Sequence, residues 1–74
     1  MSRTTWIRDA SGKSVGYIDD IGTRQTLKKN NAAGTMVGYF DGKATYQNNK
    51  GSITKLGDGN MMQVLVGLLL ANPN

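Results

Sequence analysis

The residues of this chain that could do chemistry are few, because the sequence contains no Cys, no His and no Glu. General acid–base catalysis would therefore fall to Asp, Lys or Tyr side chains. All five Asp lie in segments with the composition of turns, where a carboxylate bonds to nearby backbone. Disulfides, thiolate chemistry and nearly every structural zinc site are excluded. The sequence predicts a protein that is not an enzyme and that carries no cofactor.

Two short motifs resemble ligand-binding loops but lack essential residues. Gly12-Lys13-Ser14 matches the end of a phosphate-binding loop, yet that loop needs a glycine where this chain has Ile7. Asp19-Asp20 and Asp58-Gly59-Asn60 have the composition of calcium loops, which need about six or more oxygen ligands and a closing Glu. We therefore expect Lys13 to be exposed in a turn, and we expect no metal site.

Positive charge and aromatic rings could together bind nucleic acid. The net charge of +4 and the pI near 9.7 are compatible with contact to a polyanion, but they also suit plain solubility. Aromatic rings can stack on single-stranded bases, or they can be core residues paired across strands. The candidate cations are Arg24, Lys28, Lys29, Lys43 and Lys55, and the candidate rings are Trp6, Tyr17, Tyr39 and Tyr46. Nucleic-acid binding is kept as the alternative function.

A β-rich fold must position these residues, because a turn containing a glycine leads into a short apolar strand three times along the chain. The phrase Val-Gly-Tyr stands at 15–17 and again at 37–39, and a looser copy at 46–58 has Thr54 and Lys55 in place of Gly and Tyr. In each strand Val and Tyr should share one face of the sheet. The glycine between them should lie on the opposite face, with another part of the protein packed tightly over it. The predicted strands lie near 4–8, 14–19, 24–29, 35–41, 43–47 and 52–56.

The C-terminal segment breaks the repeat, and we favour a helix over about 60–71. Asn60 and Gln63 have the spacing of a capping box, in which the Asn60 side chain accepts from the Gln63 amide. Met and Leu favour the helix, whereas the β-branched Val64 and Val66 keep a strand open as the competing interpretation. A helix that is apolar nearly all round should be buried nearly all round.

The phrase Asp-Ala-Ser-Gly-Lys-Ser-Val-Gly-Tyr-Ile, which begins at Asp9, resembles the repeats of small bacterial β-flower proteins, of the form Asp-x-x-Gly-x-x-Val-Gly-x-Ile. The likeness extends from about Trp6 to Ala71. It implies hairpins arranged radially, with an apolar C-terminal segment. It implies no activity and no catalytic residue, because these families are largely uncharacterised.

These observations predict a single mainly-β domain over residues 1–74. It should consist of three antiparallel hairpin repeats, at about 4–19, 24–41 and 43–57, with one apolar helix packed at their base. The residues expected to be buried are Trp6, Ile7, Val15, Ile18, Leu27, Val37, Phe40, Ile53, Leu56, Val64, Leu65, Leu68 and Leu69.

The favoured function is a non-catalytic structural or protein-interaction module that acts as a homo-oligomer, because a small fold without disulfides or metals often gains stability from a partner subunit. The residues expected to mediate self-association are Met61, Met62, Gly67, Leu68 and Leu70. The N-terminus shows no signal peptide, and the apolar stretch at 61–71 is shorter than the ~20 residues that span a bilayer. We therefore expect a cytoplasmic protein without a membrane partner.

Overall fold

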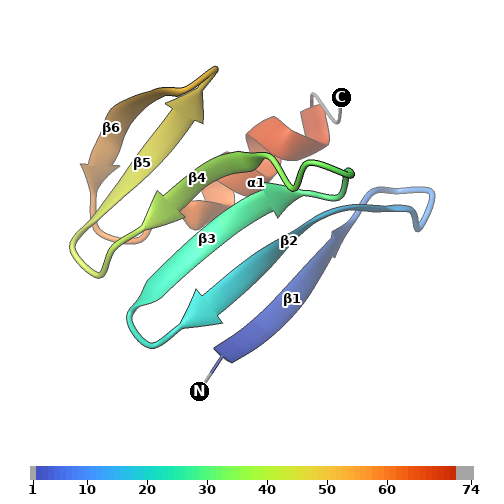
Figure 1. Cartoon of the computed structure of the whole chain (residues 1–74), viewed down its shortest axis with the longest axis horizontal. Helices are drawn as coiled ribbons and strands as arrows, with labels where there is room; N and C mark the ends of the chain where they lie inside the picture. Colours follow the sequence, from blue (N-terminus) through green and yellow to red (C-terminus); the bar gives the residue numbers. More distant parts are fainter. Residues whose placement is uncertain (1, 72–74) are drawn as a thin grey trace.

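The computed structural model describes residues 2–71 as one six-stranded antiparallel sheet with a single helix against one of its faces (Figure 1). Each strand pairs with its neighbours in the sequence, so the order in the sheet is the order in the chain. The elements are β1 (Ser2–Arg8), β2 (Ser14–Ile21), β3 (Arg24–Lys29), β4 (Met36–Phe40), β5 (Ala44–Asn49), β6 (Ser52–Asp58) and α1 (Met62–Ala71). The predicted mainly-β fold is confirmed, and the C-terminal segment is a helix rather than a strand.

Aspartates shape two of the turns, as the sequence predicts. The Asp9 carboxylate accepts from the backbone N–H groups of Ser11 and Lys13 at 2.9 and 3.0 Å. The Asp41 carboxylate accepts from the N–H groups of Lys43 and Ala44, both at 2.9 Å. The Ser11 hydroxyl also donates to Asp9, at 2.6 Å. Hydrogen bonds stabilise the ionised carboxylates: the pKa of Asp9 is lowered by the Ser11 hydroxyl and then by the backbone N–H groups, and the pKa of Asp41 is lowered by its two backbone N–H bonds.

The other three Asp are not turn residues, so the prediction for them is wrong. Asp19 and Asp20 lie within β2, and Asp58 is the last residue of β6. The hydroxyl of Thr4 donates to Asp19 at 3.0 Å, and the side-chain amide of Gln25 donates to Asp20 at 3.3 Å. For Asp19 and Asp20, neighbouring strands therefore supply the partners that a turn backbone supplies elsewhere, whereas Asp58 pairs with Lys55 of its own strand.

An extra residue interrupts the strand pairing in each hairpin. Between β1 and β2, Ile7 pairs with Gly16 and Arg8 pairs with Ser14, so Val15 is a bulge on β2. The corresponding bulged residues are Val37 on β4 and Leu56 on β6, and each stands directly before a glycine. The third repeat is therefore centred on Leu56 rather than on Ile53, which is a correction to the sequence-based alignment.

The bulges also change which side chains share a face. Val15 lies in the core beneath α1, whereas Tyr17 packs against Trp6 on the opposite face of the sheet. The expectation that Val15 and Tyr17 share a face is therefore wrong, because an inserted residue shifts the two-residue alternation at that point.

The helix packs over three glycines, which we call the glycine notches. A Cβ atom added at any of them would lie 2.6 Å from a side chain of the helix or of the residue just before it. The pairs are Gly16 with Leu69, Gly38 with Leu65, and Gly57 with Met61. The three apolar residues follow one another at intervals of four and so lie along one side of α1. The prediction of tight packing over the glycine face is confirmed.

The start of α1 is fixed by a buried hydroxyl on β5. Thr45 is fully buried; its hydroxyl donates to the Gly59 carbonyl and accepts from the Met61 N–H, both at 2.8 Å. The Asn60 side chain accepts from the Met62 N–H at 3.0 Å. Asn60 is therefore a capping residue, as predicted, although its bond goes to Met62 and not to Gln63.

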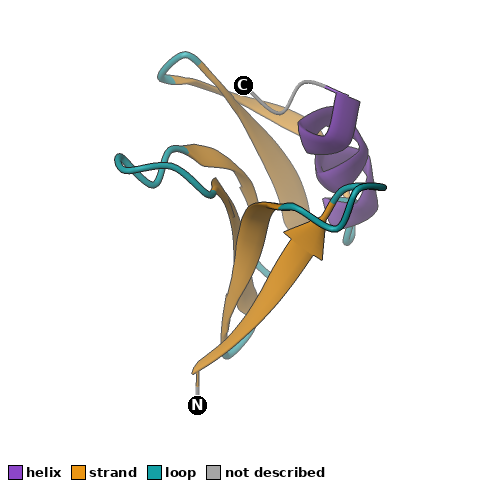
Figure 2. Ribbon diagram, turned by 90° about the vertical axis from the view of Figure 1, so that its right-hand side faces the viewer, coloured by secondary structure: helices purple, strands orange, loops and turns teal. Residues whose placement is uncertain are grey.

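The core is small, and α1 is buried on one side only, where the sheet curves around it (Figure 2). Four residues predicted to be buried are exposed instead. Trp6 and Ile53, on the edge strands β1 and β6, are 51% and 46% exposed, and Val64 and Leu68, on the side of α1 away from the sheet, are 44% and 38% exposed. The fully or nearly buried apolar residues are Val15, Leu27, Ala44, Met62, Leu65 and Leu69. A single sheet covers only one side of a helix, so burial all round was the wrong expectation.

Candidate binding surfaces

The face of the sheet opposite α1, which we call the open face, carries two pairs of aromatic rings. Trp6 on β1 and Tyr17 on β2 are register partners, with ring centroids 5.1 Å apart and ring planes inclined at 51°. Tyr39 on β4 and Tyr46 on β5 are also register partners, with centroids 5.0 Å apart and a more parallel inclination of 23°. Such cross-strand pairs stabilise the sheet by about 0.5–1.5 kcal/mol each.

Three of the predicted cations stand beside these rings. Lys28 is the register partner of Tyr17, and Lys55 is the register partner of Tyr46. The guanidinium carbon of Arg24 lies 4.7 Å from the centroid of the Tyr39 ring, within cation–π distance. Each aromatic pair therefore has at least one positive charge at its side.

Carboxylates accompany two of these cations. The Lys28 ammonium lies 3.8 Å from Asp19, and the Lys55 ammonium lies 2.7 Å from Asp58. The second contact lowers the pKa of Asp58 and raises the pKa of Lys55. The Lys55–Asp58 pair is exposed and the Lys28–Asp19 pair is partly exposed, so water screens both and each contributes little to stability. Arg24 makes no ion pair within residues 2–71.

The remaining two predicted cations lie elsewhere. Lys29 follows Lys28 on β3, and the alternation of the strand directs it to the face that carries α1. Lys43 lies in the turn between β4 and β5. Sequence reasoning cannot tell which of Lys28 and Lys29 is on the open face, because that requires knowing which face the helix covers.

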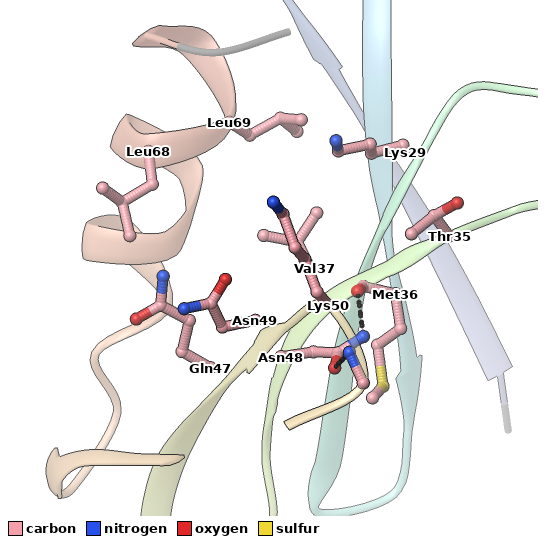
Figure 3. Close-up of a pocket in the computed structure, with 11 residues that line it drawn as sticks. Lys29, Thr35, Met36, Val37, Gln47, Asn48, Asn49, Lys50, Leu68 and Leu69 are labelled. Carbon is pink, nitrogen blue, oxygen red and sulfur yellow. Dashed lines mark hydrogen bonds between the residues drawn. The ribbon is translucent and has the colours of Figure 1, made fainter. Parts of the chain in front are cut away.

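Residues of the β4 and β5 strands and of the C-terminal half of α1 line a groove of about 690 Å³. Its apolar lining includes Val37, Leu68 and Leu69. Figure 3 shows these side chains together with the ammonium groups of Lys29 and Lys50, and with polar amides from β5. One of the amides is held in place, since the Asn48 side chain donates to the Met36 carbonyl at 2.8 Å. Sequence reasoning missed this groove because its lining comes from separate segments that share no motif.

The side of α1 away from the sheet is exposed and mostly apolar, with Gln63 as a polar side chain on it. We call it the helix outer face and define it by Val64, Gly67, Leu68 and Leu70; the three larger side chains are 44%, 38% and 40% exposed. No charged residue occurs anywhere in α1. Leu68 belongs both to this face and to the groove, so the two surfaces are continuous.

The predicted self-association residues are divided by this arrangement. Gly67, Leu68 and Leu70 are all exposed on the helix outer face, with Leu68 on the flank beside the groove and Leu70 on the opposite flank, beside the turn between β1 and β2. Met62 is 4% exposed and belongs to the core, so its predicted place at an interface is wrong. Met61 packs against Gly57 and is half-buried. The prediction for Met61 stays a prediction, whereas Met62 is in the core because the sequence does not reveal the rotation of the helix about its axis.

Within residues 2–71, no three carboxylates gather closely enough to hold a metal ion. The one described helix is also too short to cross a membrane. Comparison with protein-family models, with curated proteins and with solved structures found no match to this chain.

Proposed function

We propose that this protein is a non-catalytic interaction module that associates with copies of itself through the helix outer face. The observation that carries the proposal is the exposure of Val64, Leu68 and Leu70 on a helix without a single charged side chain. The outer side of a helix on a monomeric protein is normally polar or charged. Depletion of charge at the centre of a surface is instead typical of an interface.

A second copy is the partner that this surface fits. In a two-fold contact the same residues meet from both sides, so an uncharged strip meets itself without repulsion between like charges. Nothing lies within 4 Å of a Cβ atom added at Gly67, and a partner helix could approach closely there. The groove beside Leu68 offers a hollow for partner side chains. Association around such a shared apolar surface would also suit the resemblance to β-flower repeats, which we include in the proposal.

The size of the surface sets how much of it must take part. A stable interface buries about 800 Å² on each partner, which is roughly one sixth of the 4926 Å² that this chain exposes. The helix outer face alone is a narrow strip along ten residues. We therefore expect the contact to include the rim of the groove, which adds residues of β5 to the interface.

Light scattering on a sizing column tests the proposal. We expect the parent chain to elute at a multiple of 8.0 kDa, and we expect Leu68→Lys to shift it to 8.0 kDa with an unchanged circular dichroism spectrum. A lysine there would bring like charges together across a two-fold contact and bury them, which is unfavourable. Ile21→Lys is the matched control. Ile21 is the last residue of β2 and is 63% exposed, so this variant should leave the assembly intact.

Two results would contradict the proposal. One is a parent chain that stays at 8.0 kDa across a wide range of concentration. The other is an assembly that survives Leu68→Lys but is lost when a proline is placed on the edge strand β6, for example at Thr54. That result would mean that copies pair along their sheet edges instead.

A further inference from the structure

The rings and cations of the open face form two rows that cross the sheet. The first row runs from Lys28 on β3 through Tyr17 to Trp6 on the edge strand β1, each the register partner of the next. The second row runs across β3, β4, β5 and β6; its members are Arg24, Tyr39, Tyr46 and Lys55. The first row therefore has two aromatic rings beside one positive charge, and the second has two aromatic rings between two positive charges.

The spacing of the rows suits an extended ligand. Arg24 and Lys28 are four residues apart on β3, so roughly 13 Å separates these two cations along that strand. The rings of the second row meet β3 at Thr26, the register partner of Tyr39, and Arg24 reaches Tyr39 diagonally. No helix or strand of residues 2–71 covers the open face, since α1 lies on the other side of the sheet (Figure 2). The turn between β3 and β4 does reach its edge, because a Cβ atom added at Gly34 would lie 3.7 Å from the Tyr17 hydroxyl. A flexible chain of alternating flat rings and negative charges could cross both rows.

We infer that the open face binds single-stranded nucleic acid, with bases against the aromatic rings and phosphates against Arg24, Lys28 and Lys55. This function goes beyond self-association and uses a different face of the molecule. Single strands are favoured over duplexes because only unpaired bases present their flat faces to aromatic side chains. The same chemistry fits DNA and RNA, because neither row reads the sugar.

The charges support a polyanion as the ligand. Arg24 carries no carboxylate partner within the described residues, and its guanidinium is held at the Tyr39 ring. The side chain of Asp58 is 89% exposed, so a phosphate can replace it at Lys55 at little cost. Asp19 is the carboxylate beside Lys28, and it already accepts a bond from Thr4. Three phosphate contacts would give a slope of about −2 for log K against log salt concentration.

Trp6 reports directly on binding, because it is the one tryptophan of the chain and it is 51% exposed. Oligothymidine and oligouridine should both quench its fluorescence at low salt, whereas inorganic polyphosphate, which has no bases, should not. Binding of only one of the two strands would still support the site and would identify DNA or RNA as its ligand. No binding at low ionic strength, or equal quenching by polyphosphate, would overturn the inference.

Variants then separate the rows from general charge. Trp6→Ala should weaken the binding of a labelled strand, measured by fluorescence anisotropy, by about 5- to 150-fold. Arg24→Gln should reduce the magnitude of the salt slope by about 0.7. Lys43→Gln is the matched control, because it removes the same charge from the turn between β4 and β5. An effect of Lys43→Gln as large as that of Arg24→Gln would overturn the site.

The two proposals fail independently. Leu68→Lys lies on the helix side of the sheet, so a monomeric Leu68→Lys protein should still show quenching of Trp6 by oligothymidine. Loss of quenching in that variant, with an unchanged circular dichroism spectrum, would contradict binding at the open face of a single chain.

Discussion

Single glycines decide how closely the helix approaches the sheet. Gly16 and Gly38 each lie against both a leucine of α1 and a backbone carbonyl of the adjacent strand. Gly57 instead lies against the flexible side chain of Met61 and against no backbone atom within 4 Å. The three notches therefore differ in how readily they could accommodate a methyl group.

The first prediction concerns this difference. Gly38→Ala should destabilise the fold by about 1–3 kcal/mol, because the added carbon would meet Leu65 and the Tyr46 carbonyl, and the carbonyl cannot move away. Gly57→Ala should be close to neutral, since the Met61 side chain can rotate and the unfolded state loses entropy. Thermal melts measure both; a shift of about 4–8 °C is expected per kcal/mol. Equal melting temperatures for the two variants would show that the nearby backbone carbonyl does not decide the cost of the added methyl group.

At the scale of elements, sequence reasoning found the strands and the helix but not their faces. The repeated Val-Gly-Tyr phrases and the glycine turns are local signals, and all six strands follow from them. Which face of the sheet the helix covers, and which side of the helix is covered, depend on contacts between distant segments. Trp6 and Leu68 were therefore expected in the core, although each lies on a side that nothing in residues 2–71 covers. The aromatic residues and three of the cations were identified as a group, but their two rows depend on strand register.

The second prediction concerns the two sides of α1. Leu65→Ala should cost about 2–5 kcal/mol, because Leu65 is fully buried against the sheet. Leu68→Ala should cost less than about 2 kcal/mol in the monomer, because its side chain is 38% exposed. Urea denaturation at low protein concentration compares them without a contribution from association. A cost for Leu68→Ala that equals the cost for Leu65→Ala under these conditions would place Leu68 in the core.

For the whole molecule, three surface carboxylates contribute to the dependence of stability on pH. The pKa values of Asp9, Asp41 and Asp58 are all lowered in the fold by hydrogen bonds, whereas the pKa of Lys55 is raised by its contact with Asp58. The unfolded chain therefore takes up protons at a higher pH than the fold does at the three carboxylates.

The third prediction follows from that difference. The stabilisation from the three carboxylates should be fully present above their ordinary pKa of 3.8, and it should be lost as pH falls through their lower folded values. Urea midpoints should accordingly fall on the acid side of pH 3.8, and less so in the combined Asp9→Asn, Asp41→Asn and Asp58→Asn variant. Asn keeps the acceptor oxygen but not the charge. If the urea midpoints of parent and variant fell identically with pH, the three carboxylates would not be the origin of the acid sensitivity.

The match between glycine notches and helix residues links the number of hairpins in the sheet to the length of α1. Met61, Leu65 and Leu69 serve the third, second and first hairpins in that order, so each hairpin corresponds to about one helical turn. Duplication of a hairpin alone would create an unfilled glycine notch and leave a void beneath the new strands. A chain of this design with one more hairpin would therefore need about four more residues in its helix to fill the added notch.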